Sequence, residues 1–336
     1  MAYTTINKSG NYFNTVTYTG NGNAGHSITG VGFQPDWTWV KNRSDTYGHN
    51  LVNSVTNTLM FSNANAPEEA IGNTVTSFDS DGFTVGTSAG VNFPPDDIVS
   101  WNWLGSNTTA ANTDGSINST VSANTTNGFS IVKYTGTGSG QSNVTIGHGL
   151  GAVPKVILFK QLDTGSWIVY HHTIGKDKYL VLDTTAAEAN ATGICNPTST
   201  NIVLETSYGG TNSTAGMIAY CFSEKQGYSK FSSYTGNGNA DGTFVYTGFK
   251  PAFVMMKCTD SARSWQMHNN KSNPANSVSK RLFANLSDAE ADNTDLDFLS
   301  NGFKPRTTDL NFNGSGNNYI YMAFAEAPLV GTNGVT

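Results

Sequence analysis

The sequence has few charged residues. Asp, Glu, Lys and Arg make up 12% of its 336 residues, roughly half of the share usual in soluble proteins. The formal net charge of -6 argues against the basic surface that a nucleic-acid-binding protein needs. Hydrophobic residues at 37% and aromatic residues at 11% nevertheless indicate packed domains rather than a disordered chain. We therefore expect a folded protein without a nucleic-acid partner.

Long apolar runs and paired cysteines are also missing. No run of about 18 apolar residues occurs, so we expect no membrane insertion. The start, MAYTTINKSGNYF, lacks the basic and apolar regions of a signal peptide. The three cysteines, Cys195, Cys221 and Cys258, are expected to be reduced and buried.

Motifs for catalysis or cofactor binding are absent too. We find no Gly-x-Ser-x-Gly, His-Glu-x-x-His or P-loop spacing, and no cysteine spacing typical of zinc. The turn Asp79-Ser-Asp81-Gly82 has carboxylates that suit calcium, but it is also ordinary turn chemistry, which we favour. We expect no cofactor and no enzymatic activity.

A threefold internal repeat dominates the sequence. Residues 18–41, 134–160 and 234–257 each begin with Tyr-Thr-Gly-x-Gly and reach a proline, namely Pro35, Pro154 and Pro251. A lysine follows six residues later in every copy, at Lys41, Lys160 and Lys257. Further landmarks recur in the same order, which is typical of tandem structural repeats.

The repeats divide the chain into four parts. Residues 1–104 form a divergent first repeat, 105–128 a polar linker, 129–226 the second repeat, and 227–336 the third repeat with a loose tail after Pro328. The linker is either a flexible tether or partly an edge strand, because Ile117 and Val121 alternate with polar residues. Only residues 225–227 separate the second and third repeats, so these two should be in fixed contact.

The predicted fold is all-β. Short runs of β-branched and aromatic residues are broken by Gly and Asn, a pattern typical of β proteins. Units of about 100 residues with seven or eight strands fit a two-sheet sandwich. We therefore predict three tandem β-sandwich-like repeats of the jelly-roll or concanavalin-like kind. Large apolar residues at equivalent places, among them Trp37, Trp39, Trp103, Phe222 and Phe324, should form the cores.

A short helical turn is predicted in each repeat, at 67–70, 187–189 and 288–291. Each turn carries a recurring carboxylate, Glu69, Glu188 or Glu290. A lone repeated carboxylate usually caps or pairs locally, and we expect that role here.

Several stretches resemble a repeat domain of bacteriophage virion and tail-fibre proteins, especially of marine and cyanobacterial phages. They are GYSKFSSYTGNGNADGTFVYTGFKPAFVMMK (227–257), YIYMAFAEAP (319–328), NGFSIVKYTG (127–136) and IGHGLGAVPKVILFK (146–160). In those proteins the domain often accompanies concanavalin-like or laminin-G-type modules. The resemblance covers the second and third repeats well and implies a virion location with other virion proteins as partners. The first repeat has no tryptophan matching Trp167 or Trp265.

An aromatic platform is the candidate binding site. Sugar recognition combines an aromatic face with hydrogen-bonding amides, and the residues that fit this pattern are Trp167, Trp265, His268, Asn269 and Asn270. The alternative is that both tryptophans cap the edge of a sandwich.

The first functional hypothesis is a tail-fibre or adhesin component that binds a host cell-surface glycan through multivalent, non-covalent contacts. The second is a capsid decoration or head-fibre protein that stabilises the particle. A glycan depolymerase would need two carboxylates flanking a groove, and no pattern proposes such a pair. Three similar domains in one chain also resemble a trimer, and we leave a homo-oligomer open.

Overall fold

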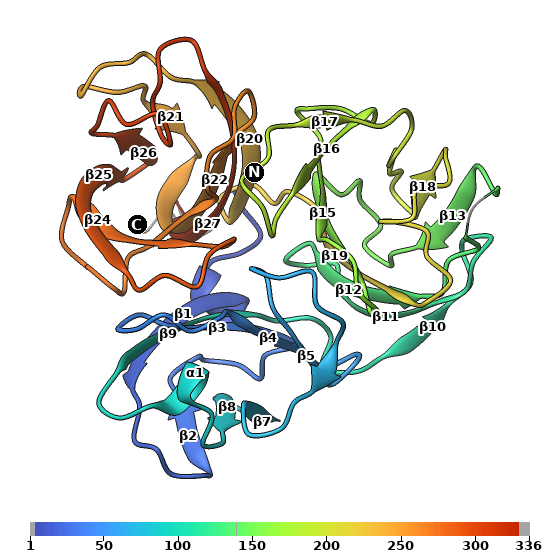
Figure 1. The fold of residues 1–336 in the computed structure, drawn as a ribbon, viewed down its shortest axis with the longest axis horizontal. Helices are drawn as coiled ribbons and strands as arrows, with labels where there is room; N and C mark the ends of the chain where they lie inside the picture. Colours follow the sequence, from blue (N-terminus) through green and yellow to red (C-terminus); the bar gives the residue numbers. More distant parts are fainter. Residues whose placement is uncertain (1–3, 139, 329–336) are drawn as a thin grey trace.

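The computed structural model describes residues 4–138 and 140–328. Strands make up 43% of the structure and helices 2%, which confirms the all-β prediction. Figure 1 shows the sheets gathered in three groups around a common centre. We call these groups segment I (13–103), segment II (110–222) and segment III (229–328). The predicted loose tail falls on 329–336, outside the described residues.

Segment I contains two sheets, with strand orders β1-β9-β3-β4-β5-β6 and β2-β8-β7. Its elements, preceded by η1 (Ser9–Asn11), are β1 (Phe13–Thr19), β2 (His26–Thr29), β3 (Trp37–Asn42), β4 (Asn50–Asn53), β5 (Thr58–Met60), β6 (Glu69–Ala70), β7 (Val75–Asp79), β8 (Gly82–Val85), α1 (Ala89–Asn92) and β9 (Asp97–Trp103).

Segment II has the orders β10-β11-β12-β19-β14-β15-β16-β17 and β13-β18. Its strands are β10 (Ala110–Asn112), β11 (Ser119–Asn124), β12 (Phe129–Tyr134), β13 (Val144–Gly147), β14 (Val156–Gln161), β15 (Ile168–His171), β16 (Lys178–Val181), β17 (Ala189–Asn190), β18 (Asn201–Leu204) and β19 (Met217–Phe222).

Segment III is one sheet with the order β20-β27-β22-β23-β24-β25-β26-β21. Its strands are β20 (Ser229–Thr235), β21 (Val245–Tyr246), β22 (Phe249–Cys258), β23 (Gln266–Asn269), β24 (Val278–Phe283), β25 (Ala291–Leu299), β26 (Gly302–Pro305) and β27 (Asn318–Pro328). The two end strands, β20 and β21, are consecutive in the chain, and the sheet is nearly barrel-like.

Six strands follow the same spatial order in all three segments. The order β1-β9-β3-β4-β5-β6 corresponds to β12-β19-β14-β15-β16-β17 and to β20-β27-β22-β23-β24-β25. In each case the last strand of this set in the chain (the closing strand: β9, β19 or β27) lies between the first strand of the common order and the strand that follows the repeated proline or, in β22, contains it. Thus Trp103 pairs with Phe13 and Trp37, and Phe324 pairs with Ser229 and Phe253.

The polar linker is ordered against segment II. Strand β11 pairs with both β10 and β12, with Val121 opposite Val132. The Ser122 hydroxyl also donates to Asp36 Oδ1 in segment I at 3.1 Å. The stretch therefore belongs to the segment II sheet, in which β10 is the end strand and β11, which starts at Ser119, lies between β10 and β12.

The three predicted helical turns are wrong. These residues are extended or lie in short strands, and their backbone N–H groups bond to the neighbouring segment instead of to their own turn. Glu68 N donates to Leu162 O at 2.8 Å, Glu188 N to Thr259 O at 2.9 Å, and Glu290 N to Arg43 O at 2.8 Å. These bonds run from segment I to II, from II to III and from III to I, so they close a ring.

A shared aromatic core fills the centre of this ring. The ring of Trp37 in segment I stacks on Tyr220 of segment II, with 4.2 Å between centroids. Phe13 stacks on Phe324 of segment III at 4.7 Å, and Phe222 contacts Phe324 at 5.9 Å. The large residues expected in separate sandwich cores are buried as predicted, but many of them pack between segments.

Each segment also has a buried hydrophobic cluster of its own on the other face of its large sheet.

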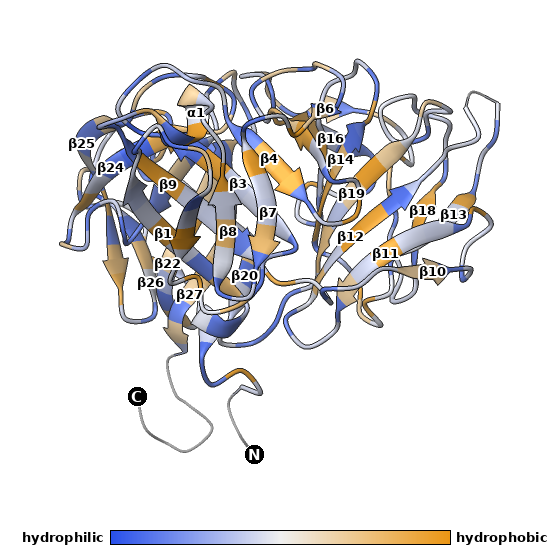
Figure 2. Cartoon of the chain, turned by 90° about the horizontal axis from the view of Figure 1, so that it is seen from below, coloured by the Kyte–Doolittle hydropathy of each residue, from blue (hydrophilic) through white to orange (hydrophobic). Residues whose placement is uncertain are grey.

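The three cysteines are buried and free, as expected. In Figure 2 the strongest hydrophobic colour lies on strands such as β4, β12 and β19. Among the described residues, no helix has the length and apolar character needed to cross a membrane.

Candidate functional site

The two tryptophans of the predicted platform lie between segments. Trp167 is 0% exposed and Trp265 is 2% exposed. Trp167 Nε1 donates to Phe61 O of segment I at 2.9 Å, and Trp265 Nε1 donates to Val181 O of segment II at 2.9 Å. A ligand from solvent cannot stack on either ring, so the exposed platform is not formed. The indoles join segments instead.

The other platform residues do not gather around the tryptophans in an exposed site. His268 is fully buried inside segment III, where burial lowers its pKa to about 3. Asn269 is also buried and caps its own turn, because its Oδ1 accepts from Lys271 N at 2.9 Å and Ser272 N at 2.8 Å. Asn270 borders a separate hollow of about 130 Å³ beside Lys250.

The three repeated lysines have a structural role that the spacing alone did not reveal. Each is buried at the end of the strand after the proline, and its ammonium group donates to carbonyl oxygens of the hairpin loop that follows. Lys257 Nζ bonds to Cys258 O at 2.6 Å and Ser261 O at 3.4 Å. Lys41 and Lys160 make the corresponding bonds. Burial lowers the pKa of all three to about 8.

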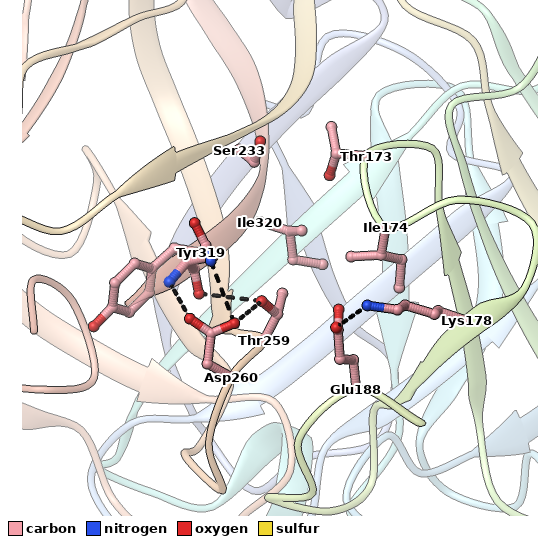
Figure 3. A pocket seen from close by; sticks show the side chains of 10 residues that line it. Thr173, Ile174, Lys178, Glu188, Ser233, Thr259, Asp260, Tyr319 and Ile320 are labelled. Atoms are coloured by element: carbon pink, nitrogen blue, oxygen red, sulfur yellow. Dashed lines mark hydrogen bonds and ion pairs between the residues drawn. The ribbon is translucent and has the colours of Figure 1, made fainter. Parts of the chain in front are cut away.

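The loop held by Lys257 forms one wall of a cavity between segments II and III. This interface cavity has a volume of about 240 Å³. Figure 3 shows side chains of both segments around it. Segment II contributes Thr173, Ile174, Lys178 and Glu188, and segment III contributes Ser233, Thr259, Asp260, Asn318, Tyr319 and Ile320.

The segment III wall is fixed by a hydrogen-bond network. Asp260 Oδ2 accepts from Asn318 N at 2.5 Å, and Asp260 Oδ1 accepts from the Thr259 hydroxyl at 3.1 Å. The backbone N–H of Thr259 donates to Asn318 O at 2.9 Å. Figure 3 shows the contact between the side chains of Asp260 and Thr259. The polar groups of this wall are thus held in place by their own neighbours.

The segment II wall carries an ion pair between Lys178 Nζ and Glu188 Oε1. Their side chains are 40% and 22% exposed, so the pair borders solvent. Between the walls, Ile174 and Ile320 supply apolar surface. Tyr319 lies behind them with its hydroxyl donating to Leu310 O at 2.7 Å, and burial raises the pKa of this phenol to about 12. The cavity is therefore polar, nearly charge-balanced and partly apolar on one side.

Comparison with known families places all three segments in one unit. A family model described as a domain of unknown function, DUF7483, matches residues 8–328. The chain belongs to this family. The DUF7483 match includes every strand of the ring. No curated protein and no solved structure matches the sequence.

The described part of this DUF7483 chain contains no cluster of side chains that could bind a metal ion. Groups of three or more His, Cys, Asp and Glu side chains that could hold an ion are absent from 4–138 and 140–328. Asp81 accepts from Gly30 N at 3.0 Å and Gly32 N at 2.6 Å, and Asp79 accepts from the hydroxyls of Ser77 and Thr84. Both carboxylates of this turn therefore accept hydrogen bonds from neighbouring residues.

No sequence motif predicts the interface cavity. Its residues come from strands and loops of two segments that are far apart in the sequence, and none forms a motif. The residue two positions after each repeated lysine nevertheless differs in size among the three repeats, and this difference points to the cavity. The copies carry Arg43, Leu162 and Thr259 there, and Thr259 is the smallest of the three.

Proposed function

We propose that this DUF7483 chain consists of three tandem β-sandwich-like repeats and serves as a phage virion structural protein, a tail-fibre or adhesin component that binds a host-surface glycan. The common order of six strands supports the repeats. The second sheets β2-β8-β7 and β13-β18 support a two-layer arrangement in segments I and II. In this proposal residues 105–128 belong to the second repeat, because β11 extends its sheet.

The interface cavity is the observation that carries the glycan-binding role. Hydroxyl, amide and carboxylate groups surround an opening next to apolar surface, which is the mixture that recognises a polyhydroxylated ring. The closed ring of backbone bonds holds the two walls in a fixed relation. Such preorganisation reduces the entropy lost on binding. One weak cavity per chain gives strong attachment when several copies on a particle act together.

The threefold arrangement of segments favours a second candidate. A capsid decoration or head-fibre protein that stabilises the particle would place this arrangement on a threefold position of the virion, among other virion proteins. In that role the outer surface of the ring, rather than the interface cavity, would make the functional contacts.

Locating the chain on intact particles tests both candidates. Antibody labelling or cryo-electron microscopy should place it on the tail or its fibres, and the purified chain should bind host cells and immobilised host glycans. Labelling confined to the capsid lattice, with no binding to host cells, would overturn the adhesin role and support the decoration protein.

A further inference from the structure

The interface cavity occupies one of three equivalent positions in the ring. At each junction the residue two positions after the repeated lysine bonds through its N–H to the closing-strand edge of its own segment. These bonds are Arg43 N to Asp97 O at 2.8 Å, Leu162 N to Gly216 O at 3.0 Å, and Thr259 N to Asn318 O at 2.9 Å. The carbonyl of the same residue accepts from Glu290, Glu68 or Glu188 of the adjacent segment. The backbone geometry at the three junctions is therefore the same.

The side chain at this position differs in size and contacts among the three junctions. At the junction of segments III and I, Arg43 reaches across the interface and forms an ion pair with Glu290, with 2.6 Å between Nη2 and Oε2. At the junction of I and II, Leu162 packs into the shared hydrophobic core. At the junction of II and III, the shorter side chain of Thr259 lines the interface cavity, and Glu188 pairs with Lys178 of its own segment.

The charges around the interface cavity argue against an ionic ligand. Lys178 is neutralised by Glu188, so no unpaired cation is available for a phosphate or carboxylate. Asp260 already accepts from Asn318 and Thr259, so it is poorly placed to provide the several free oxygens that a hard cation requires. A neutral ligand is favoured because it leaves these pairs intact.

The remaining lining groups suit a sugar ring. The Ser233 hydroxyl and the remaining hydrogen-bonding capacity of the Thr173 hydroxyl, which contacts His171 Nδ1 at 2.8 Å, offer donors and acceptors, and Ile174 with Ile320 offers apolar surface for the C–H face of a pyranose. The volume of about 240 Å³ is just below the range of pockets for drug-sized ligands, roughly 300 Å³ and more. It therefore fits one sugar unit rather than an oligosaccharide.

We infer that the interface cavity binds a single unit of a neutral saccharide and that Thr259 is the residue that keeps the site open. This inference rests on the proposed function and makes it more specific, since it names the class of glycan and the place where it binds. A neutral unit at the exposed end of a host glycan is the expected natural ligand.

The matched variants come from the chain itself. Thr259→Arg and Thr259→Leu introduce the side chains that the same backbone position accepts at the other two junctions, so the fold should tolerate them. In Thr259→Arg the guanidinium is expected to pair with Glu188, as Arg43 pairs with Glu290. Thr259→Ser keeps the cavity open and serves as the control. Thermal unfolding of all variants establishes that each is folded.

The binding experiment uses the full chain and free ligands. Methyl glycosides of glucose, galactose, mannose and N-acetylglucosamine are tested by ligand-observed NMR and calorimetry, with glucuronate and glucosamine as charged comparisons. We expect millimolar binding of at least one neutral glycoside, retained in Thr259→Ser and weakened at least tenfold in both filled variants. Binding that persists in folded Thr259→Arg and Thr259→Leu would overturn the site. Absence of binding by every neutral glycoside would overturn the ligand class.

Whole-cell attachment separates this inference from the proposed function. If the wild-type chain and the filled variants attach equally to host cells, the chain binds the host surface but the interface cavity is not the site. If the wild-type chain fails to attach to any host cell while it binds a free glycoside, the cavity assignment stands and the host-attachment role fails.

Discussion

His49 Nε2 lies 2.9 Å from the carbonyl oxygen of Phe283, and this contact joins segment I to segment III. His49 Nδ1 accepts from Trp39 Nε1 at 2.7 Å, so the ring proton is on Nε2 and is donated to Phe283. Trp167 and Trp265 make the corresponding bonds at the other two junctions. A histidine thus takes the place of the tryptophan that the first repeat lacks.

The backbone supports this equivalence. His49 N donates to Asn63 Oδ1 at 2.9 Å, Trp167 N to Asp183 Oδ1 at 2.8 Å, and Trp265 N to Asn285 Oδ1 at 2.9 Å. Each junction therefore holds its donor ring in the same way. The ring of segments depends on three such donors rather than on a flexible linker.

Replacing His49 by alanine should destabilise the protein. The change leaves Trp39 Nε1 and Phe283 O buried without their partner, and unsatisfied buried groups cost roughly 1–3 kcal/mol each. We expect the free energy of unfolding in urea to fall by about 2–4 kcal/mol. Trp167→Phe, which keeps most of the ring volume and removes the indole N–H, should cost less. A His49→Ala protein as stable as the wild type would show that the junction does not depend on this contact.

Acid should weaken the fold below about pH 6.5. Burial lowers the pKa of His49, His171 and His268 to about 3, and nearby Lys41, His172 and Arg281 respectively act in the same direction. The unfolded chain takes up protons near the ordinary histidine pKa of about 6.5, whereas the folded chain stays neutral. The free energy of unfolding therefore falls as pH falls from about 6.5 towards 3.

Urea unfolding at pH 7, 6 and 5 measures this effect before most carboxylates titrate. The full slope is at most about 1.4 kcal/mol per pH unit for each histidine. His171→Gln should reduce the slope, since it removes one of the histidines whose pKa is lowered by burial. A stability that stays constant from pH 7 to pH 5 would contradict the buried neutral histidines.

The sequence predicts strands well but says less about what each strand face contacts. Alternation shows that Trp37 and Trp39 share a buried face, yet a buried face looks the same whether it packs inside a sandwich or against another segment. The same ambiguity applies to Trp167 and Trp265, which lie buried at junctions between segments. Aromatic residues near a loop fit both a ligand platform and a junction, and the acceptors Phe61 and Val181 that decide between them lie in another repeat.

Local propensity was overridden where segments meet. The stretch around Glu188 has helix-forming residues, but its N–H bonds to Thr259 of segment III, and tertiary contacts of this kind outweigh small differences in propensity. The interface cavity was equally hidden, because it depends on the size of one side chain relative to a wall from a different segment. Aligning the three repeats and comparing the size of the side chain at each position comes nearest to predicting the cavity from the sequence.

Mild alkali should stabilise the protein. Burial lowers the pKa of Lys41, Lys160 and Lys257 to about 8, below the value of about 10.4 in an unfolded chain. Between these values the unfolded state holds more protons on these three lysines, so they raise the free energy of unfolding with pH, and they outnumber the two buried thiols of Cys195 and Cys221, whose raised pKa acts in the opposite direction. Above about pH 10 the trend should reverse, because buried tyrosines such as Tyr319, whose pKa is raised to about 12, stay neutral only in the folded state.

Denaturant unfolding from pH 7.5 to 10 checks this prediction. Lys257→Met should reduce the rise, and it should also loosen the loop of the interface cavity, since Cys258 O and Ser261 O lose their donor. Lys250→Met is a suitable control because that lysine is half exposed and paired with Glu326. A steady loss of stability from pH 7.5 to 9.5 would contradict the shifted lysines.

Among the contacts that join the segments, we expect the ion pair between Arg43 and Glu290 to be the one whose loss destabilises the protein most. It is nearly buried, with side chains 12% and 7% exposed, and Arg43 has Asp97 only at 3.9 Å as a further anion. Glu290→Gln leaves the guanidinium without its main counter-ion, which costs roughly 3–5 kcal/mol for a buried pair. Urea unfolding should show this loss, and hydrogen exchange should show faster opening of the junction between segments III and I.

A double variant separates the charge from the packing. Arg43→Leu with Glu290→Gln copies the junction of segments I and II, where Leu162 occupies the equivalent position and packs into the shared core. Because no charge is then left unpaired, the double variant should recover most of the stability lost in Glu290→Gln. Arg43 donates to both carboxylate oxygens of Glu290, from Nε to Oε1 at 3.0 Å and from Nη2 to Oε2 at 2.6 Å. If the double variant is instead as unstable as the single variant, the junction depends on this bidentate geometry, and the three interfaces are less interchangeable than their backbone hydrogen bonds indicate.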